Sequence, residues 1–274
     1  MKKRGRSAVA VMVGLLGFGA HAALAAPATH PGTTVTGAGS TFALNMVEQW
    51  KSDFKKSADV TVAYTGVGSG AGRAQLIAGT VDFAASDIAA AAAQAQQLKD
   101  KYGDFVQAPV TAGAVSVLYK VPGLPDLKLS AVTLAKIFSG AIDSWKDALI
   151  EADTGVPGPD LPIQVFVRSD KSGTSGVMTE YLTKVAGGDW PAGATETFPT
   201  SGGQIGKAGS DGVANAVAAS TGGIGYAEHS FAIERGLAEV KVKNGAGQFR
   251  PPDTKSVTEA IDDGVLNPDG TLTL

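Results

Sequence analysis

The chain has 274 residues, of which 44% are hydrophobic, 18% charged and 7% aromatic, with a formal net charge of −3. This composition is that of a globular protein, and the lack of cysteine in the sequence excludes disulfides, thiolate metal sites and a lipid-modified N-terminal cysteine. Three histidines leave little for histidine-based metal or general-base chemistry.

The first 25 residues have the pattern of a secretory signal peptide, in which a basic start precedes an apolar stretch over 8–19 and a small-x-small cleavage site at 23–25. The alternative is a membrane anchor, but the apolar run is shorter than the ~20 residues that a span needs. We predict cleavage of residues 1–25 and a periplasmic protein. The mature chain then keeps 19 Lys and Arg against 26 Asp and Glu, a net charge of −7, which disfavours nucleic acid as a partner.

Residues 26–33 are predicted as a flexible tether, and the chain up to residue 119 then alternates apolar runs, Gly-rich turns and helical patterns. The predicted strands are 34–36, 60–64, 83–87, 106–110 and 114–119. The predicted helices are 41–56, with Ser40 or Thr41 as its cap, 73–78 and 89–101. Phe42, Met46, Trp50 and Phe54 form a stripe in the first helix, which we interpret as core packing for all but Phe42.

The second half repeats this texture, with a stretch over 186–209 predicted to be irregular. Its predicted helices are 131–138, 174–185 and 211–219, and its predicted strands are 163–168, 224–227 and 240–242. The pattern predicts an α/β protein of two lobes, each a mixed sheet flanked by helices. We assign 34–112 to the first lobe, with 245–274 returning to it, and 113–244 to the second.

Four turns of Gly, Ser and Thr stand beside predicted helix starts, at 39–41, 68–70, 172–174 and 209–212. Glycine lets backbone N–H groups turn inward, hydroxyls add donors, and a helix N-terminus carries partial positive charge. One such turn alone is usually only a turn. Four of them favour a site for an oxyanion.

Two charged residues follow predicted strands and sharpen this hypothesis. Arg168 precedes a Ser-Gly-Thr helix start and could hold a tetrahedral anion, with Asp170 fixing its direction; a surface ion pair is the alternative. Asp87 could cap the next helix. If it faces the anion instead, it would accept a hydrogen bond from a protonated oxyanion such as hydrogen phosphate and reject sulfate.

The sequence does not match the common motifs for nucleotide binding or for a catalytic serine. Residues 202–207 lack one residue of a Walker A loop, 66–72 match a dinucleotide fingerprint only weakly, and no nucleophile elbow is present. We expect no catalytic residue, no metal and no cofactor.

Six ordered motifs identify a family. They are Thr36-Gly37-Ala38-Gly39-Ser40-Thr41-Phe42, Tyr64-x-Gly66-x-Gly68-Ser69-Gly70, Val81-Asp82-Phe83-Ala84-Ala85-Ser86-Asp87, Ile137-Phe138-Ser139-Gly140, Arg168-x-Asp170-x-Ser172-Gly173-Thr174-Ser175 and Gly223-Ile224-Gly225-Tyr226. In this order they resemble the periplasmic phosphate-binding proteins of ABC-type phosphate transporters.

The resemblance implies a two-lobed periplasmic-binding-protein fold, type II-like, that closes on inorganic phosphate in the cleft between the lobes. It also implies a monomer that delivers phosphate to an inner-membrane ABC permease. Carried over position by position, the phosphate ligands are Thr41, Phe42, Ser69, Asp87, Arg168, Ser172, Gly173 and Thr174, with Asp170 holding Arg168.

Two features depart from the family pattern. Gly70 stands where a serine is frequent, and the sequence stops at Leu274 where family members continue, so we expect a first lobe truncated in its C-terminal part. The alternatives to phosphate transport are a secreted phosphatase-like hydrolase and a receptor for another oxyanion.

Overall fold

The structure is a computed structural model that describes residues 10–17, 32–262, 264–267 and 272–273. Contacts divide the chain into two compact units. We call residues 12–111 with 265–273 the N-terminal unit, and residues 112–264 with residues 10 and 11 the central unit.

The chain passes from one unit to the other within strand β5 (Val106–Lys120), between Thr111 and Ala112. This differs from the prediction of two strands with a turn at 111–113. Gly113 does not adopt a positive φ, so it continues the extended backbone instead of turning it.

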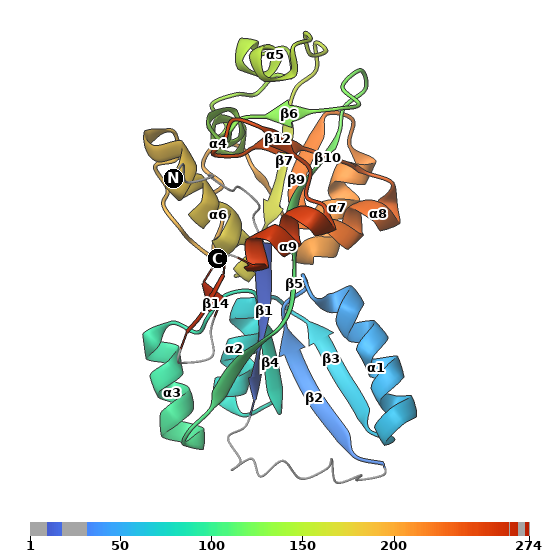
Figure 1. Ribbon diagram of the computed structural model, residues 1–274, viewed down its shortest axis with the longest axis vertical. Coiled ribbons are helices and arrows are strands. Elements are labelled where there is room, and N and C mark those ends of the chain that lie inside the picture. Colours follow the sequence, from blue (N-terminus) through green and yellow to red (C-terminus); the bar gives the residue numbers. More distant parts are fainter. Residues whose placement is uncertain (1–9, 18–31, 263, 268–271, 274) are drawn as a thin grey trace. The chain divides into compact units, whose positions relative to one another are not determined.

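The N-terminal unit is a mixed sheet with strand order β3 (Thr61–Gly66), β2 (Thr34–Gly39), β4 (Phe83–Ser86) and β1 (Ala10–Gly17). Strand β2 is parallel to β3 and β4, and β1 is antiparallel to β4. Helix α1 (Leu44–Ala58) packs along β3, and α2 (Ser69–Ala78) packs on β2 and β4 (Figure 1). Helix α3 (Ala92–Tyr102) closes a small core of Leu76, Ala84 and Leu98.

Strand β1 lies within the segment predicted as a signal peptide. Its register places Gly14 opposite Ser86 and Leu16 opposite Ala84. The other parts of that segment, 1–9 and 18–25, lie outside the described residues, as do residues 26–31 of the predicted tether. Cleavage after residue 25 therefore stays a prediction, and it would remove β1 from the sheet.

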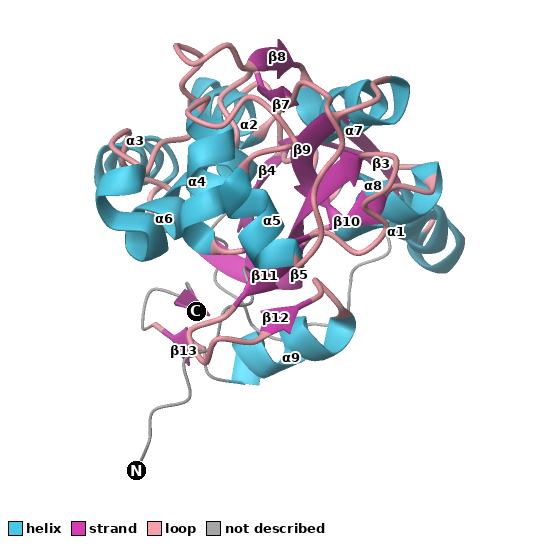
Figure 2. Cartoon of the chain, turned by 90° about the horizontal axis from the view of Figure 1, so that it is seen from above, coloured by secondary structure: helices cyan, strands magenta, loops and turns pink. Residues whose placement is uncertain are grey.

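The central unit is also a mixed sheet. Strand β5 pairs antiparallel with β9 (Gly223–Glu228) and β10 (Ala238–Glu239), and β9 continues parallel to β7 (Gln164–Arg168), which is parallel to β8 (Ile205–Lys207). Helices α4 (Ala131–Ser139) and α6 (Gly173–Ala186) lie on one side of β9, and α7 (Gly209–Ala219) and α8 (His229–Arg235) lie on the other (Figure 2). The mixed α/β class is confirmed in both units.

The remaining elements are short. They are β6 (Lys128–Leu129), α5 (Ala148–Thr154), the 3-10 helix Gly187–Asp189, β11 (Lys241–Lys243), β12 (Phe249–Arg250), α9 (Thr254–Asp262), β13 (Val265–Leu266) and β14 (Leu272–Thr273). Strand β8 and the 3-10 helix fall in the stretch predicted to be irregular. Among the described residues, no helix combines the length and the apolar character that crossing a membrane requires.

The aromatic stripe of the first helix is not core packing throughout. Helix α1 begins at Leu44, so Phe42 precedes it, and Trp50 and Phe54 are 40% and 43% exposed. Residues four apart in an α-helix drift by about 40° around its axis, so the far end of the stripe has turned away from the sheet. The side chain that α1 buries is Val47.

Of the segment 245–274 expected to return to the first lobe, residues 245–264 belong to the central unit, and the described residues 265–267 and 272–273 belong to the N-terminal unit. Strand β12 pairs with β11, and Val257 of α9 packs against Ala114 of β5. These contacts hold residues 245–264 to the central unit.

Candidate functional site

The strand ends of the N-terminal unit bring two helix starts together. The Gly39 carbonyl oxygen at the end of β2 accepts hydrogen bonds from Val67 N (3.0 Å) and Gly68 N (2.8 Å), just before α2. Ser40 N donates to the Ala85 carbonyl oxygen of β4 (2.9 Å). The turns before α1 and α2 and the end of β4 therefore meet at one edge of the sheet.

Two glycines make this meeting possible. Gly39 has φ +143°, and a Cβ there would lie 2.0 Å from the Ala85 carbonyl oxygen. A Cβ on Gly72 in α2 would lie 2.4 Å from the Gly39 Cα. Only residues without a side chain let α2 begin this close to the end of β2.

The predicted ligands of the first lobe all lie at this edge and are buried. Thr41 is 5% exposed, Phe42 4%, Ser69 1% and Asp87 5%. Ser69 is the first residue of α2, where backbone N–H groups have no partner within the helix and the macrodipole favours an anion. Neither Ser40 nor Thr41 is the N-cap residue of α1, which is Ala43, although Ser40 Oγ accepts from Ala43 N (3.3 Å).

Asp87 does not cap the following helix. Helix α3 begins at Ala92, and its N-cap residue is Ala91. The Asp87 carboxylate instead accepts a hydrogen bond from Ser40 Oγ, and its backbone N–H donates to Ser69 Oγ (3.2 Å). Asp87 is thereby tied to both helix starts.

A buried cation near Asp87 was missed in the sequence. Arg73 of α2 is 1% exposed, and its Nη1 donates to Ser86 Oγ (2.6 Å) while its Nε donates to Gln94 Oε1 (3.0 Å). Ser86 Oγ in turn donates to the Ile88 carbonyl oxygen (2.7 Å). Nothing in the sequence around Arg73 distinguishes it from a surface residue of an amphipathic helix.

The predicted ligands of the second lobe gather in the central unit. Arg168, at the end of β7, is 2% exposed. Its guanidinium donates to both carboxylate oxygens of Asp170, with Nε 2.8 Å from Oδ1. Asp170 Oδ1 also accepts from the backbone N–H of Gly209 at the start of α7 (3.0 Å), and Arg168 Nη1 lies 3.4 Å from Ser210 Oγ. The predicted role of Asp170 in holding Arg168 has the required geometry.

Helix α6 begins a few residues after Arg168 in the sequence. Ser172 is its N-cap residue, with Ser172 Oγ accepting from Ser175 N (3.2 Å), and Gly173 and Thr174 form its first turn. Ser172 and Thr174 are fully buried. The turn provides the hydroxyls and N–H groups that suit an oxyanion.

Tyr226 of β9 forms hydrogen bonds to both β7 and α6, and it was not predicted as a site residue. Its hydroxyl accepts from Arg168 N (3.2 Å) and lies 2.6 Å from Ser175 Oγ on α6. Burial raises the pKa of Tyr226 to about 12, and the bond to Ser175 only partly offsets this. The phenol therefore stays a neutral hydrogen-bonding group at physiological pH.

The predicted residues thus form two groups, each within its own unit: Thr41, Phe42, Ser69 and Asp87 in the N-terminal unit, and Arg168, Asp170, Ser172, Gly173 and Thr174 in the central unit. Within the described parts of the chain, no three His, Cys, Asp or Glu side chains come together as a metal site would require.

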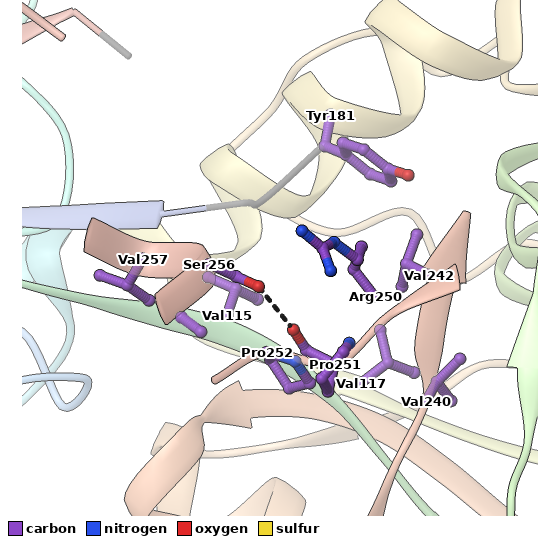
Figure 3. Close-up of a pocket in the computed structure, with 11 residues that line it drawn as sticks. Val115, Val117, Tyr181, Val240, Val242, Arg250, Pro251, Pro252, Ser256 and Val257 are labelled. Carbon is purple, nitrogen blue, oxygen red and sulfur yellow. Dashed lines mark hydrogen bonds between the residues drawn. The ribbon is translucent and has the colours of Figure 1, made fainter. Parts of the chain in front are cut away.

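A cavity of about 40 Å³ lies elsewhere in the central unit. Figure 3 shows its lining, in which Arg250 and Tyr181 join a wall of valines and the Ser256 hydroxyl bonds to the Pro251 carbonyl oxygen (3.1 Å). This volume holds about one water molecule, and none of the predicted ligands lines it.

Comparisons with known proteins agree with the motifs. A family model described as a PBP superfamily domain matches residues 25–270. The phosphate-binding protein PstS of Haemophilus influenzae is 37% identical over 232 residues, which cover 83% of this chain and 67% of that protein. The phosphate-binding protein PstS 3 of Mycobacterium leprae is 36% identical over 216 residues, 78% of this chain and 58% of that protein. The chain thus spans about two thirds or less of the length of these relatives.

Solved structures give the same result for the fold. A high affinity periplasmic phosphate-binding protein, solved with phosphate bound at pH 8.5, matches with a TM-score of 0.72 and 26% identity over 87% of this chain and 72% of that one. A DING protein matches with a TM-score of 0.71 and 25% identity over 86% of this chain and 71% of that one.

Proposed function

Because this chain belongs to the PBP superfamily, with relatives named phosphate-binding protein PstS, we propose that it is a receptor for inorganic phosphate. One phosphate is held by Thr41, Phe42, Ser69 and Asp87 together with Arg168, Ser172, Gly173 and Thr174. The receptor then delivers its ligand to an ABC-type permease.

The proposal depends above all on one group of residues in the central unit, which we call the Arg168 cluster: Arg168, Asp170, Ser172, Gly173 and Thr174. A guanidinium that is 2% exposed and fixed by Asp170 precedes a helix start that offers hydroxyls and backbone N–H groups. Guanidinium and main-chain donors match the oxygens of a tetrahedral anion. This set of hydrogen-bond donors can bind phosphate, and binding of this kind makes or breaks no covalent bond.

The Asp87 carboxylate limits the possible ligands to oxyanions that carry a hydrogen. A buried carboxylate in contact with an oxyanion repels it unless a hydrogen lies between them. Hydrogen phosphate supplies that hydrogen at neutral pH, and sulfate does not. The Asp87 carboxylate therefore supports phosphate over another oxyanion as the ligand.

The cellular part of the proposal rests on the relatives and on the leader pattern. The signal peptide over residues 1–25 directs the chain to the periplasm and is cleaved, and the mature chain works there as a monomer without a cofactor. We assign it no enzymatic step. Turnover of an aryl phosphate that disappears in Ser172→Ala would instead favour a phosphatase-like hydrolase.

Calorimetric titration of the purified chain tests the proposal. We expect one phosphate per chain and sulfate binding weaker by on the order of 10⁴-fold, because a site built to pair a substrate hydrogen rejects an analogue that lacks it. Arg168→Met should abolish phosphate binding. Its matched control is Arg235→Met, which breaks an ion pair with Asp211 in the same unit and should bind as the unchanged chain does. Equal affinity for both anions would refute the proposal.

A further inference from the structure

We propose that Ser40 is a specificity-determining positioning residue, whose hydroxyl holds the Asp87 carboxylate as the acceptor for the hydrogen of the ligand. The inference rests on the proposed function and names a residue beyond the predicted ligand set. It starts from the hydrogen bond between Ser40 Oγ and Asp87 Oδ1, which joins residues 47 positions apart.

The backbone N–H, the carbonyl oxygen and the hydroxyl of Ser40 all form hydrogen bonds. It is fully buried, and its N–H donates to the Ala85 carbonyl oxygen (2.9 Å). Its carbonyl oxygen accepts from the Tyr64 hydroxyl (2.8 Å), and its Oγ accepts from Ala43 N (3.3 Å). With the Oγ acceptor side occupied in this way, the hydroxyl hydrogen is directed at Asp87.

The backbone of Asp87 is fixed on both sides by other groups. Its N–H donates to Ser69 Oγ, and Ser86 Oγ reaches across to the Ile88 carbonyl oxygen while it accepts from Arg73 Nη1. These bonds fix the backbone position of Asp87 without the Ser40 hydroxyl. What the Ser40 hydroxyl contributes is the direction of the Asp87 side chain, because its hydrogen bond reaches the carboxylate itself.

Two further groups that can carry charge lie around Asp87. Tyr64 of β3 bonds to Ser40, and burial followed by the Asp87 charge raises the pKa of Tyr64, so it stays neutral. Arg73 of α2 is buried and bonds to Ser86, the neighbour of Asp87. The Tyr64 hydroxyl donates to the main-chain oxygen of Ser40, and Arg73 donates to Ser86 and Gln94.

Loss of this one hydroxyl has opposite consequences for the two anions. Phosphate loses an acceptor that is already in place, so its affinity falls. Sulfate loses a fixed charge that repels it, because a carboxylate without the Ser40 hydrogen bond is freer to turn away from the ligand. The ratio of the two affinities therefore changes more than either affinity does, which a general loss of structure would not produce.

The experiment compares phosphate and sulfate titrations of the full chain and its variants. We expect Ser40→Ala to lower the phosphate-to-sulfate affinity ratio by roughly tenfold or more, the scale of a hydrogen bond to a charged group. Ser40→Cys fills the buried space with a weaker donor and carries the same test if the alanine variant does not fold. The matched control is Ser116→Ala, which removes a buried hydroxyl that has no partner among the described residues and should leave the ratio unchanged.

A double-mutant cycle separates positioning from packing. In an Asp87→Asn background the charged partner is gone, so adding Ser40→Ala should change the ratio by less than twofold. If the chain without substitutions prefers phosphate, and Ser40→Ala and Ser40→Cys both keep the same phosphate-to-sulfate affinity ratio, the Ser40 inference is overturned while phosphate binding stands. An unchanged chain without selectivity would overturn the proposed function itself.

Discussion

Asp170 fixes the direction of the Arg168 guanidinium, and its own ionisation depends on that contact. Burial would raise the pKa of Asp170, but the hydrogen bonds and the charge of Arg168, with the Gly209 N–H, outweigh this and leave it below the ordinary value. A group whose pKa is lowered on folding stabilises the folded chain above its unfolded pKa, here about 3.9. That contribution is lost as the pH falls through the folded pKa.

We therefore predict that Asp170→Asn lowers the free energy of unfolding by a constant amount between pH 5 and 8. Asp170→Asn leaves the buried Arg168 guanidinium without its carboxylate partner, which costs on the order of 3 kcal/mol. Below about pH 4 the difference from the unchanged chain should shrink, because the aspartate is then protonated as well. Urea unfolding at a series of pH values measures this, and a difference that grows on acidification would contradict it.

The two hydrogen-bonded pairs that hold the charged site residues differ in how readily they can be predicted from the sequence. Arg168 and Asp170 are two residues apart at a strand end, so their contact could be predicted from spacing alone. Ser40 and Asp87 are 47 residues apart and meet only because β2 and β4 are neighbours in the sheet. Sequence spacing identifies Asp87 as unusual but gives no information on which residue holds it.

At the scale of elements, the close approach of α2 to β2 depends on Gly72. Alanine is a better helix former than glycine by up to about 1 kcal/mol, so propensity alone favours Gly72→Ala. The Cβ, however, would lie 2.4 Å from Gly39 Cα and 2.7 Å from the Ala38 carbonyl oxygen, which are backbone atoms that cannot rotate away.

We predict that Gly72→Ala destabilises the chain by about 1–3 kcal/mol, the usual cost of overpacking, and weakens phosphate binding because Ser69 begins the same helix. Gly212→Ala is the matched control. It occupies the same fourth position of α7, but its Cβ meets Lys207 Cβ at an ordinary 3.5 Å, so this change should be neutral or stabilising. Urea unfolding of both variants decides, and equal effects would contradict the argument.

Half of the strands in the described residues and two thirds of their α-helices could be predicted from periodicity, including β7 and α6 around the Arg168 cluster. The failures have physical causes. Gly113 suggested a turn but continues β5, and the aromatic stripe of α1 drifts from buried to exposed over three turns. The segment 245–264 joins the central unit through long-range contacts of Val257 and β12 that no local pattern announces.

For the whole molecule, the proposed function makes one demand that neither unit meets alone. Asp87 belongs to the N-terminal unit and Arg168 to the central unit, so a single phosphate must depend on both. The tryptophans allow the two units to be observed separately. Trp50 belongs to the N-terminal unit, whereas Trp145 and Trp190 are buried in the central unit, and the sequence contains no other tryptophan.

We predict that phosphate stabilises the central unit only when Asp87 is intact. In a Trp50→Phe chain, fluorescence reports the central unit, and phosphate at 100 times its dissociation constant should raise the free energy of unfolding by about 2.7 kcal/mol. Adding Asp87→Ala, a change in the other unit, should abolish this shift at the same phosphate concentration. If Trp145 and Trp190 still report the full shift, the central unit holds phosphate without help from the N-terminal unit, and the shared site is wrong.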